Sequence, residues 1–164
     1  MLLRPRSVRV KSNSEIEHMR EACRLAADTL CKVAEIVRPG ITTEEINEFV
    51  HADTLSKGAI PAPLNYHGFP KSVCTSINDV VCHGIPSPDV VLRDGDIINV
   101  DVTHIFDGFH GDTSATFYVG TPSAEAIKVT EVSRQCLELG IAEVKPGARL
   151  GDIGAAIEEF ATAQ

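Results

Sequence analysis

The sequence predicts an α+β fold, because segments with helical periodicity enclose a central block rich in strands and turns. Apolar residues recur at helical spacing over about 14–37 and again beyond residue 123. Between them, the stretch 59–120 consists of short Val, Ile, Phe and Thr runs separated by Pro, Gly, Asn and Asp, which is strand and turn chemistry. The order of elements is therefore helices, then strands, then helices.

The first two helices have recognisable starts. The first is expected over about 14–37, where Ser14 followed by Glu17 forms an S-x-x-E capping box. The second begins at Thr42, where Glu45 completes another capping box, and it ends near residue 58.

The third and fourth helices, expected over about 123–144 and from residue 150 onward, repeat the first pair. Arg38-Pro39-Gly40 corresponds to Lys145-Pro146-Gly147 at an offset of 107 residues. Chance resemblance between two amphipathic helix pairs is the alternative. A true repeat predicts a second strand block after the second helix pair, so the sequence is expected to be an incomplete molecule.

Composition narrows the class of protein. The 164 residues are enough for one domain, 43% of them are apolar, and the net charge is −8. The acidic balance argues against general nucleic-acid binding, and no apolar run has the roughly 18–20 residues that a membrane span needs. Five cysteines without a C-x-x-C pair favour a reducing compartment. We expect a basic N-terminal arm over 1–13 and a single domain over 14–164.

One β-hairpin is the most informative segment. Asp107-Gly108 between two alternating runs is a strong signal for a type I′ turn. With that turn, Asp101 lies opposite Ser114, and Asp112 shares the face of Ser114. The two aspartates then project from one face as diagonal neighbours, about 7–8 Å apart at the backbone.

A pair of carboxylates on one face of a hairpin suits divalent cations. Oxygen ligands without thiolates are compatible with Mn, Fe, Co or Zn, and they do not determine which of these metals binds. The alternative is that Asp101 and Asp112 are ordinary edge-strand or turn acids, although Asp has poor strand propensity. Two carboxylates are also too few for a stable transition-metal site. His104 and His110, which flank the turn, are expected to be solvated strand ends.

Two longer segments carry a family resemblance. They are Asn65-Tyr66-His67-Gly68-Phe69-Pro70-Lys71 and Ser72-Val73-Cys74-Thr75-Ser76-Ile77-Asn78-Asp79-Val80-Val81-Cys82-His83-Gly84-Ile85-Pro86. With the two-aspartate hairpin, they closely resemble type I methionine aminopeptidases of peptidase family M24, from about Ser14 onward. The resemblance implies the pita-bread fold, in which outer helices surround a curved antiparallel sheet.

The same resemblance implies a set of site residues. Asp101 and Asp112 match the first two of five ligands to two divalent metal ions, with Asp112 bridging. His83 matches a catalytic histidine that contacts the substrate and stabilises or protonates the tetrahedral intermediate. The substrate pocket corresponds to Tyr66, His67, Phe69 and Cys74, with His67 at the rim. Asn78 and Val80 resemble a site for a monovalent cation.

The function implied is removal of the initiator methionine from nascent proteins by metal-activated water, in the cytoplasm. The partners implied are the N-termini of nascent chains in which a small residue follows Met. Whether the chain acts on them at the ribosome is left open. No nucleic acid or membrane is implied. The family's other ligands, one histidine and two glutamates, are expected beyond Gln164. We therefore expect weak metal binding, and a catalytically inactive fragment or binding module of the same fold is the alternative.

Overall fold

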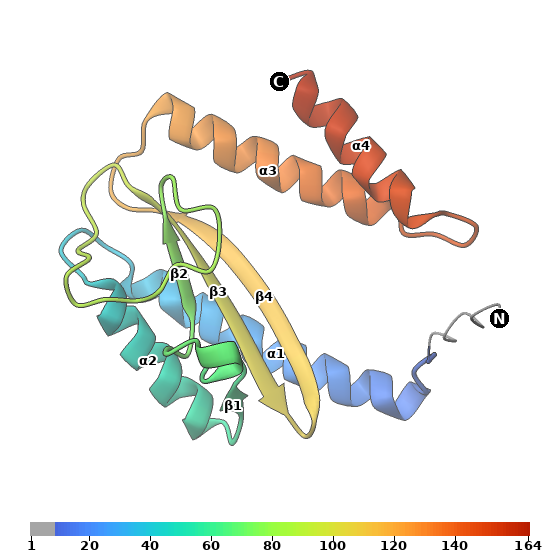
Figure 1. Ribbon diagram of the computed structural model, residues 1–164, viewed down its shortest axis with the longest axis horizontal. Coiled ribbons are helices and arrows are strands. Elements are labelled where there is room, and N and C mark those ends of the chain that lie inside the picture. The colour runs from blue at the N-terminus through green and yellow to red at the C-terminus, as the bar shows by residue number, and fades with distance from the viewer. Residues whose placement is uncertain (1–8) are drawn as a thin grey trace.

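The structure is a computed structural model that describes residues 9–164, so most of the predicted basic arm lies outside the described residues. A curved sheet has two helices on one face, and two further helices form a separate pair (Figure 1). In chain order the elements are α1 (Asn13–Ile36), α2 (Thr43–Ser56), β1 (Ile60–Pro61), a short 3₁₀ turn (Tyr66–Gly68), β2 (Cys74–Ile77), β3 (Ile97–Phe106), β4 (Phe109–Tyr118), α3 (Ala124–Ala142) and α4 (Leu150–Thr162). The predicted order of helices, strands and helices is confirmed.

Strand β3 organises the antiparallel sheet. Along one edge it pairs with β4 over the full length of both strands. Along the other edge it pairs with β2 near its start and with β1 near its end. Each of the other three strands therefore pairs with β3, which brings together residues far apart in the sequence.

The predicted turn and register of the hairpin are confirmed. Asp107 and Gly108 both have positive φ, 50° and 79°, as a type I′ turn requires. Asp101 pairs with Ser114, and Thr103 pairs with Asp112.

The two faces of β3 differ in polarity. Ile98, Val100 and Val102 are fully buried on the face that packs against the helices. Apolar side chains of α1 and α2 complete this core, including Ala26, Leu30, Val33, Ile46 and Val50. The odd-numbered residues of β3, among them Asp101, face the opposite side.

The capping box of α1 differs from the prediction. Ser12, not Ser14, is the N-cap: its Oγ accepts a hydrogen bond from the Glu15 backbone N–H at 3.3 Å. The Glu15 carboxylate accepts from the Ser12 N–H at 2.8 Å. Ser14-Glu17 was wrong because the sequence contains two overlapping S-x-x-E patterns and the helix begins at the earlier one. The Thr42–Glu45 box of α2 is confirmed.

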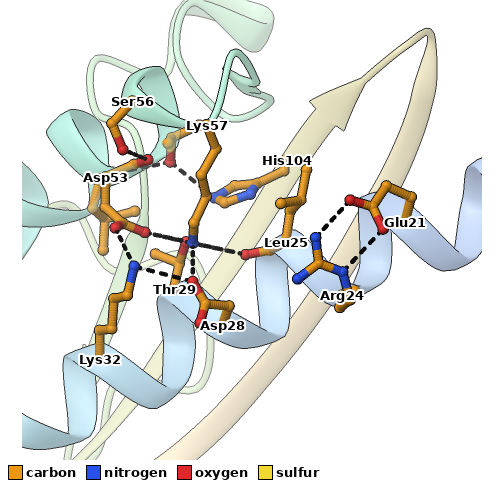
Figure 2. A network of polar contacts seen from close by, with 12 residues as sticks. Glu21, Arg24, Leu25, Asp28, Thr29, Lys32, Asp53, Ser56, Lys57 and His104 are labelled. Atoms are coloured by element: carbon orange, nitrogen blue, oxygen red, sulfur yellow. Dashed lines mark hydrogen bonds and ion pairs between the residues drawn. The ribbon is translucent and has the colours of Figure 1, made fainter.

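His104 is the largest departure from the prediction. It was expected to be a solvated strand end, yet it is fully buried between β3 and the helices. Its ring lies beside a polar network that links α1 to α2 (Figure 2). At the centre of the network, the Lys57 ammonium contacts both Asp28 and Asp53, at 2.8 and 2.6 Å.

Hydrogen-bond geometry fixes the tautomer of His104. Thr54 Oγ1 donates to the Val50 carbonyl at 2.6 Å, so its single proton is used. His104 Nε2 lies 2.8 Å from the same oxygen and must therefore donate to it. Nδ1 is left as a buried acceptor without a partner among the described residues. Burial first, and then the positive charge of Lys57, lower the pKa of His104 to about 4.

The helix repeat is also present in the structure. Shifting α1 and α2 by 107 residues brings them onto α3 and α4 within a few residues at each end. The second pair packs mainly on itself, with Gly140 of α3 close to Ile153 and Ile157 of α4. Several apolar side chains of this pair are exposed, including Leu137, Ile141 and Val144. No helix among the described residues has the length and apolarity of a membrane span.

Candidate metal and substrate site

Two carboxylates meet on the outer face of the hairpin. Because Asp112 pairs with Thr103, it is a diagonal neighbour of Asp101 on the same face of the sheet. Burial raises the pKa of Asp101, and the negative charge of Asp112 raises it further, while His83 acts in the opposite direction. Among residues 9–164, no lysine or arginine contributes to this balance. Two acidic side chains without a cationic partner fit the binding of a metal cation, which would relieve their repulsion.

A cavity of about 750 Å³ opens over these carboxylates. Its lining comes from the segment after β1, from β2, from the loop before β3, and from β3 and β4. The lining residues are Ala62, Pro63, Tyr66, His67, Gly68, Phe69, Pro70, Cys74, His83, Ile85, Asp101, Thr103, His110 and Asp112. The cavity thus brings together all seven residues that the sequence analysis assigned to the divalent metals, the substrate pocket and catalysis.

The aromatic wall is shaped by an irregular turn. Asn65 and His67 both have positive φ, 66° and 48°. The rings of Tyr66 and His67 meet edge to face, with centroids 4.4 Å apart. Tyr66 and His67 are exposed, whereas Phe69 is half-buried. The wall is therefore apolar toward its base and polar toward its mouth.

Cys74 is buried at the start of β2, where it pairs with Asp101. Burial, with added repulsion from Asp101 and other nearby groups, raises the pKa of this thiol to about 11. The thiol stays protonated at neutral pH and is a poor nucleophile, so its place in the cavity suits a soft packing surface.

His83 lies in the loop between β2 and β3 and has a positive φ of 55°. Its side chain is exposed and lines the cavity that contains both aspartates. Gly84, the next residue, is held against β2 by two hydrogen bonds.

Asn78 and Val80 lie outside the cavity. The Asn78 side chain joins the loop to the start of β3: its Nδ2 donates to Asp96 at 2.9 Å, and its Oδ1 accepts from the Ile97 N–H at 3.1 Å. Both residues are exposed. Their assignment to a monovalent cation stays a prediction.

His110 is a member of the site that the sequence analysis missed. Its expected exposure is correct, but it lines the same cavity as the aspartates. The signal was available, because residues two apart on a strand share a face and His110 precedes Asp112 by two. Thr103 belongs to the same face, where it pairs with Asp112.

The metal ligand set is small. Over residues 9–164, no group of three or more His, Cys, Asp or Glu side chains is arranged to hold a metal ion. The described residues thus offer two candidate carboxylate ligands on this face of the hairpin.

Comparison with known proteins identifies the family. A sequence profile of metallopeptidase family M24 matches residues 17–164. Methionine aminopeptidase A of Synechocystis is 58% identical over 158 residues, which are 96% of this chain and 62% of that protein. The chain therefore belongs to metallopeptidase family M24. Within that family it groups with the type I methionine aminopeptidases, as the sequence motifs predicted.

Solved structures agree with this assignment. Methionine aminopeptidase of Rickettsia prowazekii superposes with a TM-score of 0.93 at 47% identity, covering 96% of this chain and 63% of that one. The Thermotoga maritima enzyme gives 0.92 at 34% identity with the same coverage. The predicted pita-bread fold is confirmed, and this chain spans about 60% of the length of the proteins it matches.

Proposed function

We propose that this chain carries the first two metal-ligating carboxylates and the methionine pocket of a methionyl aminopeptidase, which removes the initiator methionine from nascent proteins. The single cavity that collects Asp101, Asp112, His83 and the aromatic wall carries the proposal. The two aspartates come from the β3–β4 hairpin, whereas His83 and the aromatic wall come from loops that precede β3 in the chain.

Asp101 and Asp112 would hold the divalent ions in this proposal. Co, Mn, Fe and Zn all accept carboxylate oxygens. When bound, such ions would activate water as the nucleophile and polarise the scissile carbonyl. Binding of the free N-terminal amine of the substrate beside these ions would restrict cleavage to the first residue.

The substrate methionine fits the apolar part of the cavity. Phe69 and Cys74 present polarisable surfaces to a thioether, and Tyr66 closes the side of the pocket. His67 lies at the rim with its ring exposed, where the second residue of the substrate would pass. A small second residue meets least steric hindrance there.

His83 acts on the reacting peptide bond. Its imidazole lines the same cavity as the carboxylates, close enough for its charge to lower the pKa of Asp101. An imidazole can both donate a hydrogen bond and transfer a proton, so His83 can stabilise the tetrahedral intermediate and deliver a proton to the leaving amine. Asn78 and Val80 offer exposed loop positions for a monovalent cation, which would stiffen the connection from β2 to β3.

A second candidate is a non-catalytic binding module, or an inactive fragment, of the same fold. Two carboxylates form a weaker metal centre than five ligands, and the described residues contain no third ligand. Such a chain would bind peptides that begin with methionine in the cavity without cleaving them.

The proposed partners are nascent chains in which a small residue follows Met, and the proposed location is the cytoplasm. The five cysteines are free thiols, as expected in a reducing compartment.

Release of methionine from the peptide Met-Ala-Ser tests the first candidate. Turnover that Co or Mn stimulates, that EDTA abolishes and that His83→Ala reduces at least about 100-fold would support the enzyme. A folded chain that binds the peptide but releases no methionine with any of the four metals would favour the binding module. The variant Asp107→Asn is a matched control, because Asn-Gly also suits a type I′ turn.

A further inference from the structure

We propose that Ser76 and Gly84 are positioning residues that hold His83 in the cavity. The inference rests on the proposed function, in which His83 acts on the substrate. We call residues 78–84 the His83 loop and its attachment to β2 the Ser76–Gly84 clamp.

His83 needs an external restraint. Its φ of 55° places a residue that has a Cβ in the left-handed region, which is sparsely populated and persists when the surroundings enforce it. The imidazole is exposed, and no hydrogen bond from another described residue holds it. The restraint must therefore act through the backbone of a neighbouring residue.

Gly84 supplies that restraint through two hydrogen bonds. The Thr75 N–H donates to the Gly84 carbonyl at 2.9 Å. The Gly84 N–H donates to Ser76 Oγ at 3.2 Å. Both partners are buried residues of β2, which is itself paired with β3. The peptide groups on both sides of Gly84, one of which joins it to His83, are thereby fixed to the sheet that carries Asp101.

The close approach explains why this residue is a glycine. A Cβ at position 84 would lie 2.0 Å from the Thr75 carbonyl oxygen and 3.1 Å from the Ser76 Cα. Those atoms belong to the backbone of a paired strand and have little freedom to move. The φ of Gly84 is not in the left-handed region, so the requirement is for space alone.

The far end of the loop is fixed as well. The Asn78 side chain bonds to Asp96 and to the Ile97 N–H, which attaches that end to the start of β3. The residues between, 79–82, are exposed. His83 joins this exposed stretch to Gly84, so the clamp is the nearest fixed point on the chain and determines where its ring lies.

The test uses NMR of the intact chain, first without metal. Amide hydrogen exchange at Gly84 reports on the clamp directly. Ser76→Ala removes the acceptor and should accelerate this exchange about fivefold, the equivalent of one net hydrogen bond of about 1 kcal/mol. Exchange of the buried β3 amides should not change, which separates loosening of the loop from loss of the fold.

The second arm adds Mn²⁺ alone and compares paramagnetic broadening of the His83 and His110 ring signals. Both rings line one cavity, so the same bound metal broadens both, and the ratio of the two broadenings does not depend on how much metal is bound. His110 lies on a paired strand and serves as the fixed reference. Ser76→Ala and Gly84→Ala should lower the broadening of His83 relative to His110 several-fold. Gly154→Ala is the matched control, because a Cβ at that position meets nothing within 4 Å.

The two arms fail separately. If Gly84 exchange and the broadening ratio are unchanged in Ser76→Ala, the clamp is overturned. If Mn²⁺ broadens neither ring in the parent chain, the proposed metal site is wrong, while the exchange result still decides the clamp. Should Gly84→Ala not fold, Ser76→Ala decides alone.

Discussion

The buried imidazole of His104 should make the stability of this domain depend on pH between about 4 and 6.5. Its pKa is lowered to about 4 from an ordinary value of 6.5, by burial first and then by Lys57, although Asp53 acts in the opposite direction. In the unfolded chain the ring binds a proton at the ordinary value. Between the two pKa values the unfolded state therefore binds more protons, and the free energy of unfolding falls as the pH decreases.

The magnitude follows from the difference between the two pKa values. Each tenfold change in proton affinity corresponds to about 1.36 kcal/mol, so the neutral buried ring contributes roughly 3 kcal/mol to the free energy of unfolding. This contribution is fully present above pH 6.5, falls through the window, and is gone below pH 4. Because the ring is fully buried, solvent screening does not reduce it much.

Urea unfolding at about pH 7 and about pH 4.5 measures this loss, with His104→Gln as the comparison. Glutamine keeps an N–H for Thr54 Oγ1 and does not titrate. The parent chain should lose roughly 2–3 kcal/mol more between the two pH values than the variant does. Equal losses would refute the assignment of His104 as a buried neutral base.

Two further predictions concern packing and helix capping. Gly111→Ala should destabilise the fold by roughly 1–3 kcal/mol, because its Cβ would lie 2.1 Å from the Ala22 carbonyl oxygen of α1; an unfolding midpoint equal to that of Gly154→Ala would contradict this. Ser12→Ala should cost about 1 kcal/mol by removing the N-cap of α1, whereas Ser14→Ala should cost little. If thermal unfolding instead shows that Ser14→Ala is the more destabilising of the two, the Ser14–Glu17 capping box predicted from the sequence would be correct after all.

The hairpin was predictable because its signals are local. Asp107-Gly108 defines the turn, and the turn with strict alternation defines the register of Asp101 and Asp112. Convergence of the distant segments into one cavity was not predictable from periodicity. It came from the family resemblance, since no local pattern reports which loops meet across a sheet.

The wrong prediction for His104 and the missed cavity position of His110 share one cause. His104 has the same strand parity as Val100 and Val102 and follows them into the core, while His110 has the parity of Asp112 and lies in the cavity. Both were predicted to be solvated because histidine is polar and they lie near the strand ends. The alternation of side chains along each strand would have placed them on the correct faces. Burial of His104 is tolerable because Thr54 accepts its one N–H, a partner that lies 50 residues away and that no sequence window reveals.

The most direct test of the proposed metal centre is a calorimetric titration of the chain with Co²⁺ or Mn²⁺. Binding should be measurable in the parent chain and in Asp107→Asn, and it should disappear in Asp101→Asn and in Asp112→Asn, with all four chains folded. Binding that is equal in all four, or that follows Asp107 instead, would contradict a metal centre on this face of the hairpin.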